Sequence, residues 1–265
     1  MTQMGGRGGT LPWPLGQILD ETLIETMMLL TPELVALTIR DVCDDGPEPG
    51  WTLLSEAELD RLVDRIESDA GSDPVFVFAY GSLIWNPEFQ PVSRQRATAH
   101  GWHRSFSLKI KRWRATSDQP GLMMALERGG QCDGIVFELS ADRRRQDLRA
   151  LVAREIKYRE VIDMVRWLPV RTQNGVRKAL TFWASTKRSG LTTPLPPEQA
   201  SSLIAGACGQ GGSCAEYLHN TIVDLDAEGI RDRNLWRLQA LVAAEIIGRQ
   251  NMLGGTLAST PPADQ

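Results

Sequence analysis

The order of secondary-structure signals along the chain is the feature that most constrains its fold. Six apolar, β-prone segments lie near residues 75–80, 105–110, 121–128, 134–139, 161–170 and 176–185. A single helical segment interrupts them after the fourth, and helical segments precede and follow the whole group. Many short strands joined by turns favour a closed or nearly closed barrel. The sequence therefore predicts an α+β fold, a small mixed β-barrel of about six strands with peripheral helices.

Alternation within these segments supports the strand assignment. Phe106, Leu108 and Ile110 alternate with polar residues, which is the period-2 pattern of a half-buried strand. The stretch Leu126–Gly134 contains paired glycines between two apolar runs and predicts a hairpin connection.

Residues 1–70 have the pattern of an N-terminal helical extension. We expect a helix from about residue 15 to 30, and a second one for which Thr31 is the N-cap. A third helix follows Ser55, which forms a capping box with Glu58. Residues 71–250 are expected to form the main domain.

The C-terminal part of that domain is predicted to be helical. Ser213 and Glu216 form a second capping-box pattern, and the last helix is expected to end at Gly248. Residues 251–265 are expected to be a flexible tail.

Composition excludes several classes of function. The net charge of -4 gives no support for a nucleic-acid or membrane partner. The four cysteines are scattered without a CxxC pair, and the chain has only three histidines, so neither a metal site nor a disulfide framework is expected. No apolar run is long enough to cross a bilayer. We therefore expect a soluble cytoplasmic protein.

One carboxylate stands on the apolar side of a predicted helix. The helix is expected to begin at Ser140, and its apolar stripe consists of Leu148, Leu151, Val152 and Ile156. By the same spacing Glu155 belongs to this stripe. It is either a glutamate at the stripe edge that reaches solvent or an arginine, or a general acid/base whose pKa is raised by desolvation.

The first predicted strand ends in an unusual turn. The stretch Val75–Trp85, VFVFAYGSLIW, breaks an apolar run at Tyr80-Gly81-Ser82 and then continues it. A glycine after a strand usually marks an ordinary turn or bulge. It also allows a ligand to approach the backbone, whose N–H groups then act as anion donors.

Taken together, these features resemble the ChaC-type γ-glutamylcyclotransferases. Val75–Phe89 matches the family's strand followed by YGSLIW-N-P-x-F. The resemblance continues in the stretches 101–110, 119–139, 153–156 and 216–238. It covers about residues 75–240.

The resemblance implies a small barrel enzyme without metal or organic cofactor that cleaves glutathione into 5-oxoproline and cysteinylglycine. It implies that Glu155 is the catalytic residue. The substrate-binding residues that it implies are Tyr80, Gly81, Ser82, Leu83 and Tyr217, with Val77, Phe78 and Ala79 leading into the turn.

The chain departs from the family pattern in three places, one of which is Arg114-Ala115-Thr116, where the family has RGT. Ala79 replaces the usual glycine before the YGS turn, and the segment after Glu155 reads IKYREVIDM instead of the family's glycine-containing run. Because that segment borders the substrate, a cyclotransferase for another γ-glutamyl amine or peptide, or a binding protein without catalysis, stays an alternative. Arg112 or Arg114 is a candidate partner for the substrate's glycyl carboxylate.

Overall fold

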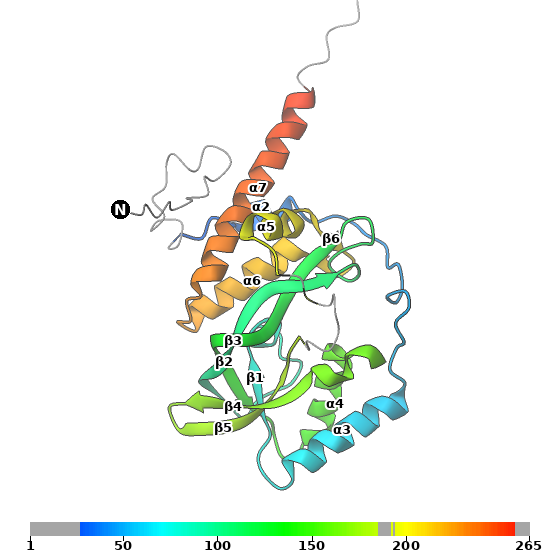
Figure 1. Ribbon diagram of the computed structural model, residues 1–265, viewed down its shortest axis with the longest axis vertical. Helices are drawn as coiled ribbons and strands as arrows, with labels where there is room; N and C mark the ends of the chain where they lie inside the picture. The colour runs from blue at the N-terminus through cyan, green and yellow to red at the C-terminus, as the bar shows by residue number, and fades with distance from the viewer. Residues whose placement is uncertain (1–26, 185–191, 193, 258–265) are drawn as a thin grey trace, which may run out of the picture.

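The computed structural model of this protein describes residues 27–184, 192 and 194–257 (Figure 1). The helix expected over residues 15–30 lies almost entirely outside the described residues, and its last four residues are not helical. The domain boundaries expected at residues 70 and 250 stay predictions.

Five strands close into a barrel. They are β1 (Phe76–Ala79), β2 (Ser93–Ile110), β3 (Gly121–Glu138), β4 (Val165–Thr172) and β5 (Gly175–Phe182). Their order is β1-β3-β2-β4-β5, and a parallel pairing of β1 with β5 closes the ring. The predicted mixed barrel is confirmed, with five strands where the sequence predicted about six.

The strand count differs because the paired glycines do not end a strand. Residues 121–138 form the single strand β3, so the hairpin predicted at Leu126–Gly134 is wrong. Gly129 and Gly130 have φ values of 108° and 68°, and pairing with β2 shifts register beside them. Glycines in this conformation form a bulge that bends the long β2–β3 ribbon. The ribbon extends beyond the barrel to the C-terminal helices (Figure 1).

Alternate residues of the strands face two separate apolar cores. Phe78 belongs to a cluster with residues from all five strands, which is the barrel interior. Val77 and Ala79, which flank Phe78, pack outward into the larger core beneath the helices. This alternation directs the end of β1 toward both cores.

Two helices cover one side of the barrel. The helix α3 (Glu56–Ala70) confirms the predicted capping box, since the Ser55 N–H donates to Glu58 Oε2 over 3.0 Å. It packs against α4 (Arg144–Glu155), which starts four residues after the predicted N-cap Ser140 because residues 141–143 form a turn. Arg145 of α4 binds Asp64 and Glu67 of α3, both over 2.7 Å.

The remaining helices form a second layer at the far end of the ribbon (Figure 1). They are α2 (Pro32–Ala36), α5 (Pro197–Gly206), α6 (Cys214–Ala227) and α7 (Arg233–Leu257). Thr31 is the predicted N-cap of α2, and Ser213 that of α6. The fully buried Gln239 of α7 accepts hydrogen bonds from the N–H groups of Leu29 and Leu30. The helix α7 continues past Gly248, where its end was predicted, and also includes residues 251–257 of the predicted tail.

Short elements connect these layers. They are the 3-10 helices η2 (Ser82–Ile84) and η3 (Arg159–Met164), and the two-residue strands β6 (Cys208–Gly209) and β7 (Gly212–Ser213). Because η3 occupies residues 159–164, the strand predicted over 161–170 begins only at Val165.

Candidate active site

The turn after β1 is held by close contacts on both sides. The chain leaves β1 at Ala79 and enters η2 at Ser82, where the Ile84 N–H donates to the Gly81 carbonyl over 2.9 Å. A Cβ on Gly81 would lie 3.0 Å from the Tyr217 hydroxyl and 3.2 Å from Met124 Sδ. Glycine therefore leaves room here for the close approach of α6 and β3 to the turn, and a larger residue would have to displace Tyr217 or Met124.

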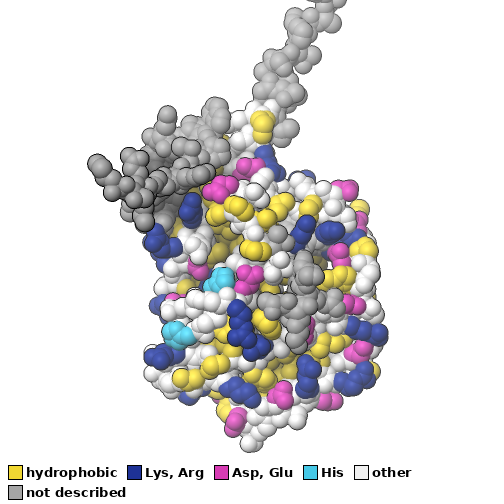
Figure 2. Space-filling view, viewed as in Figure 1, with side chains coloured by type: hydrophobic (Ala, Val, Ile, Leu, Met, Phe, Trp, Pro, Cys, Tyr) yellow, Lys and Arg dark blue, Asp and Glu magenta, His cyan; other side chains and the backbone are white. Residues whose placement is uncertain are grey.

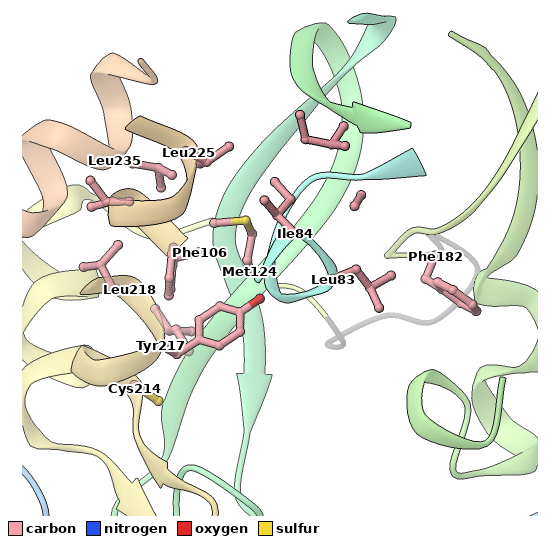
Figure 3. Close-up of a cluster of buried hydrophobic side chains, with 14 of the residues drawn as sticks. Leu83, Ile84, Phe106, Met124, Phe182, Cys214, Tyr217, Leu218, Leu225 and Leu235 are labelled. Atoms are coloured by element: carbon pink, nitrogen blue, oxygen red, sulfur yellow. The ribbon is translucent and has the colours of Figure 1, made fainter. Parts of the chain in front are cut away.

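Tyr217 reaches this turn from α6. Figure 3 shows its hydroxyl directed at the segment that carries Leu83 and Ile84. The ring is 4% exposed and makes edge contacts with Trp85 and Phe106, at centroid distances of 6.3 and 5.8 Å. Aromatic contacts of this kind hold the ring in one orientation.

The Tyr217 hydroxyl stays protonated in this environment. Burial raises its pKa, and hydrogen bonding by Ser82 opposes the shift. A buried neutral phenol is a hydrogen-bond donor for an oxygen atom of a ligand.

Tyr80 faces the barrel mouth. Its hydroxyl donates to the Phe182 carbonyl at the end of β5 over 2.8 Å. Burial raises its pKa well above the usual value, and the charge of Glu155 acts in the same direction. Tyr80 therefore lines the candidate site as an uncharged side chain.

Glu155 is the last residue of α4. Its side chain is 23% exposed, and Oε1 lies 3.2 Å from Nε of Arg154. Burial raises the pKa of this carboxyl, the charge of Arg154 opposes the shift, and the charge of Glu88 adds to it. A position at the negative end of the helix dipole disfavours the carboxylate further.

Glu155 lies near the turn that follows β1. The charge of Glu155 raises the pKa values of both Tyr80 and Tyr217, which flank the turn. Arg154 joins the two parts directly, since it donates to the Asn86 carbonyl and pairs with Glu88 over 3.4 Å, both just after η2. The carboxyl, the two phenols and the turn are therefore candidates for one site between α4, α6 and the mouth of the barrel.

The other predicted binding residues support the turn from within the core. Val77, Phe78 and Ala79 are each 0% exposed, and Leu83 is 7% exposed. Their side chains pack in the two cores, so only their backbone groups are available to a ligand.

Sequence reasoning missed three neighbours of the site. Met124 packs beside Gly81, Arg154 links α4 to the turn, and Glu88 acts on the Glu155 charge. Met124 lies in a continuous apolar run of β3, so no local signal marks it. Arg154 lies in the stretch 153–156 that carries the resemblance, but helical spacing does not mark it.

Arg114, a candidate for the substrate carboxylate, is occupied within the protein. Its guanidinium donates to Glu216 over 2.5 Å and to the Ser213 carbonyl over 2.9 Å. Glu216 therefore pairs with Arg114 and does not complete the capping box predicted with Ser213. Arg112 likewise donates to Lys111 and Ser117.

The described part of the chain offers neither a metal site nor a membrane-spanning helix. No group of three or more His, Cys, Asp or Glu side chains there could hold a metal ion. No helix there is long and apolar enough to cross a membrane.

The closed barrel and the turn that follows β1 define a fold class. The structure resembles the crystal structure of the yeast γ-glutamyl cyclotransferase specific to glutathione, with a TM-score of 0.57 at 18% identity, over 65% of this chain and 96% of that one. The fold is that of the γ-glutamyl cyclotransferases.

Sequence comparison defines the family. The model of the ChaC-like proteins matches residues 75–245, and the chain belongs to this family. The glutathione-specific γ-glutamylcyclotransferase of Escherichia coli K12 is 31% identical over 185 residues, which cover 69% of this chain and 78% of that protein. The glutathione-specific γ-glutamylcyclotransferase 1 of Danio rerio is 26% identical over 182 residues, covering 67% and 93%.

Proposed function

We propose that this protein cleaves the γ-glutamyl bond of glutathione and releases 5-oxoproline and cysteinylglycine. The observation that carries the proposal is a partly desolvated carboxyl, Glu155, placed beside the Tyr80–Leu83 turn. The names of the E. coli and Danio rerio relatives support glutathione as the substrate.

The reaction is an intramolecular aminolysis. The α-amine of the γ-glutamyl group attacks its own γ-carbonyl carbon, a carbon–nitrogen bond closes the five-membered lactam, and the bond to the cysteine nitrogen breaks. No nucleophile from the protein is needed. The protein must fold the γ-glutamyl chain into a reactive conformation, for which effective molarities reach about 10⁵–10⁸ M.

Glu155 moves the proton in this scheme. The attacking amine must first lose a proton, because an ammonium group has no free electron pair. Glu155 accepts that proton and then donates it to the leaving nitrogen, a contribution of roughly 10²–10⁴-fold to the rate. The attacking nitrogen loses a second proton when the lactam forms, and this proton ends on the released amine, which leaves as an ammonium. A raised pKa fits this role, since it makes the carboxylate a stronger base than an exposed one.

The turn and Tyr217 hold the substrate. Backbone N–H groups of residues 80–83 and the Tyr217 hydroxyl are donors for oxygen atoms of the γ-glutamyl group. The close packing of Tyr217 on Gly81 keeps these donors in place before substrate binds.

The proposal is tested by incubating the purified protein with glutathione and quantifying 5-oxoproline and cysteinylglycine. We expect equimolar products, and a loss of at least about 10²-fold in kcat for Glu155→Gln. Glu198→Gln, which changes a half-exposed glutamate on α5, is the matched control and should keep full activity. An active and folded Glu155→Gln protein would contradict the role of Glu155.

The same assay separates the alternatives. A panel of γ-glutamyl dipeptides and γ-glutamyl amines distinguishes a cyclotransferase of other specificity, which would release 5-oxoproline from one of them and not from glutathione. A binding protein without catalysis would release none, while glutathione would still raise its Tm.

We expect the protein to act in the cytoplasm. All four cysteines are free, and three of them are buried. Unpaired thiols are typical of a reducing compartment.

A further inference from the structure

Trp113, in the loop between β2 and β3, has an unusual backbone conformation. Its φ is 67°, a value that bulky residues rarely adopt, and its side chain is 48% exposed. Such conformations persist only where the surroundings impose them, and they cluster at functional sites.

The β6–β7 hairpin fixes this tryptophan. The Gly211 N–H donates to the Trp113 carbonyl over 2.8 Å. A Cβ on Gly211 would lie only 2.4 Å from the indole Cε2, so the ring packs directly on the glycine backbone. Trp113 is therefore half exposed and yet rigidly placed.

The side chain of Lys157 also contacts the Trp113 ring. Its ammonium lies 4.7 Å from the centroid of the Trp113 ring. Within the described residues no carboxylate lies within 4.0 Å of this ammonium, whereas Arg112 and Arg114 are both bonded to protein groups. Lys157 is thus the basic group near Glu155 that has no acidic partner there.

The segment that carries Lys157 is held in place by the N-terminal part of the chain. The Leu54 N–H donates to the Lys157 carbonyl over 3.0 Å, and the Glu48 N–H donates to the Tyr158 hydroxyl over 3.0 Å. Trp51 makes an edge contact with Tyr158 at 5.3 Å. Residues 48–54 therefore position the backbone that follows Glu155.

We propose that Lys157 and Trp113 form the subsite for the leaving dipeptide of the substrate. The ammonium of Lys157 binds the terminal carboxylate of the dipeptide, and the indole of Trp113 packs against its backbone. This inference rests on the proposed function, because it assigns the other half of the same substrate.

Chain dimensions agree with the assignment. A dipeptide spans about 7 Å when extended, and the Cα atoms of residues two apart lie within about 7 Å of each other. A substrate whose scissile nitrogen lies at Glu155 therefore brings its terminal carboxylate within reach of Lys157. Lys157 is also close enough to Glu155 for its charge to act on that carboxyl.

The test compares glutathione with its C-terminal carboxamide, using 5-oxoproline release at the plateau of the pH profile. We expect Lys157→Met to raise KM for glutathione about tenfold with kcat within about twofold, and to leave KM for the carboxamide unchanged. Trp113→Ala should raise KM for both substrates. Lys157→Glu should reverse the preference, because it places a negative charge beside the carboxylate.

Lys178→Met is the matched control. Lys178 lies 4.8 Å from the ring of Trp167 and also donates to the Asp69 carbonyl over 2.9 Å. It pairs in register with Pro169 in the middle of the β4–β5 ladder. This variant should keep both KM values.

The outcomes separate the subsite from the proposed function. A native protein that releases no 5-oxoproline from either substrate overturns the proposed function. A native protein that is active but does not distinguish the two substrates, or a Lys157→Met variant that raises both KM values equally, overturns the Lys157 subsite alone.

Discussion

The Tyr217 hydroxyl lies 3.0 Å from the point that a Cβ on Gly81 would occupy. Met124 Sδ stands 3.2 Å from the same point, so side chains from α6 and β3 close on the backbone of the turn. The turn after β1 and the N-terminal half of α6 are therefore packed as one unit, and changes to either should affect the same step of the reaction.

Gly81→Ala should lower kcat/KM without unfolding the protein. The added methyl group must displace the Tyr217 hydroxyl or Met124 Sδ by a few tenths of an ångström, and small misplacements at a reacting centre reduce rates up to about 10²-fold. Steady-state kinetics measures the loss, and circular dichroism verifies the fold.

Tyr217→Phe supplies the control for that variant. It removes the oxygen that the new methyl group contacts, so the double variant Gly81→Ala/Tyr217→Phe should be less impaired than the sum of the single effects predicts. Strictly additive losses would show that the two residues do not interact.

The pH profile of kcat/KM should have an acid limb above pH 4.5. Glu155 must be ionised to accept a proton, and its pKa is raised from 4.5 mainly by burial. Activity is therefore lost as the pH falls through this raised pKa.

Glu88→Gln should move that acid limb to lower pH, because the negative charge of Glu88 raises the pKa of Glu155. Rate measurements across the pH range locate the acid limb in the native protein and in the variant. A shift to higher pH, or none, would exclude Glu88 as a neighbour that acts on the catalytic carboxyl.

Glu155→Gln should stabilise the folded protein at neutral pH. The folded state holds a proton on Glu155 more tightly than the unfolded chain does, so the native protein loses stability as the pH rises from 4.5 through the raised pKa. A neutral glutamine avoids this loss, and gains of about 0.5–2 kcal/mol are common for such replacements.

Denaturant unfolding at several pH values tests the sign of this effect. The stability difference between Glu155→Gln and the native protein should shrink as the pH falls and vanish below about pH 4.5. A difference that grows toward acid pH would mean that the folded state favours the ionised carboxyl.

Arg114→Met should destabilise the protein by about 1–3 kcal/mol, since it leaves the Ser213 carbonyl and the partly buried Glu216 without their hydrogen-bond donor. The Arg114 side chain is 10% exposed, and its guanidinium lies 5.7 Å from the Tyr217 ring, so activity should fall as well. Arg237→Met, in an exposed pair with Glu198 at 3.8 Å, should change stability by less than about 0.5 kcal/mol. Equal losses of stability in the two variants would show that burial does not increase the contribution of the Arg114 ion pair.

Local signals in the sequence determined much of the framework. The capping box of Ser55 with Glu58 and the N-caps Thr31 and Ser213 depend on hydrogen bonds within one turn, and the structure has them where they were predicted. The alternating strands likewise predicted a barrel. Where the pattern was ambiguous, at the paired glycines 129 and 130, it predicted a turn, but pairing with β2 made a bulge.

Helical spacing singled out Glu155 as a carboxyl on an apolar stripe, because helix periodicity is readable within a few residues. Its pKa shift, its coupling to Tyr80 and Tyr217, and the occupation of Arg114 by Glu216 are decided only by the tertiary structure. These properties depend on which segments approach one another, and burial and Coulomb interactions act through space, not along the chain. The sequence by itself singled out the residues that we propose to carry the chemistry, and the packing of α4 and α6 on the mouth of the barrel decided how they lie relative to one another.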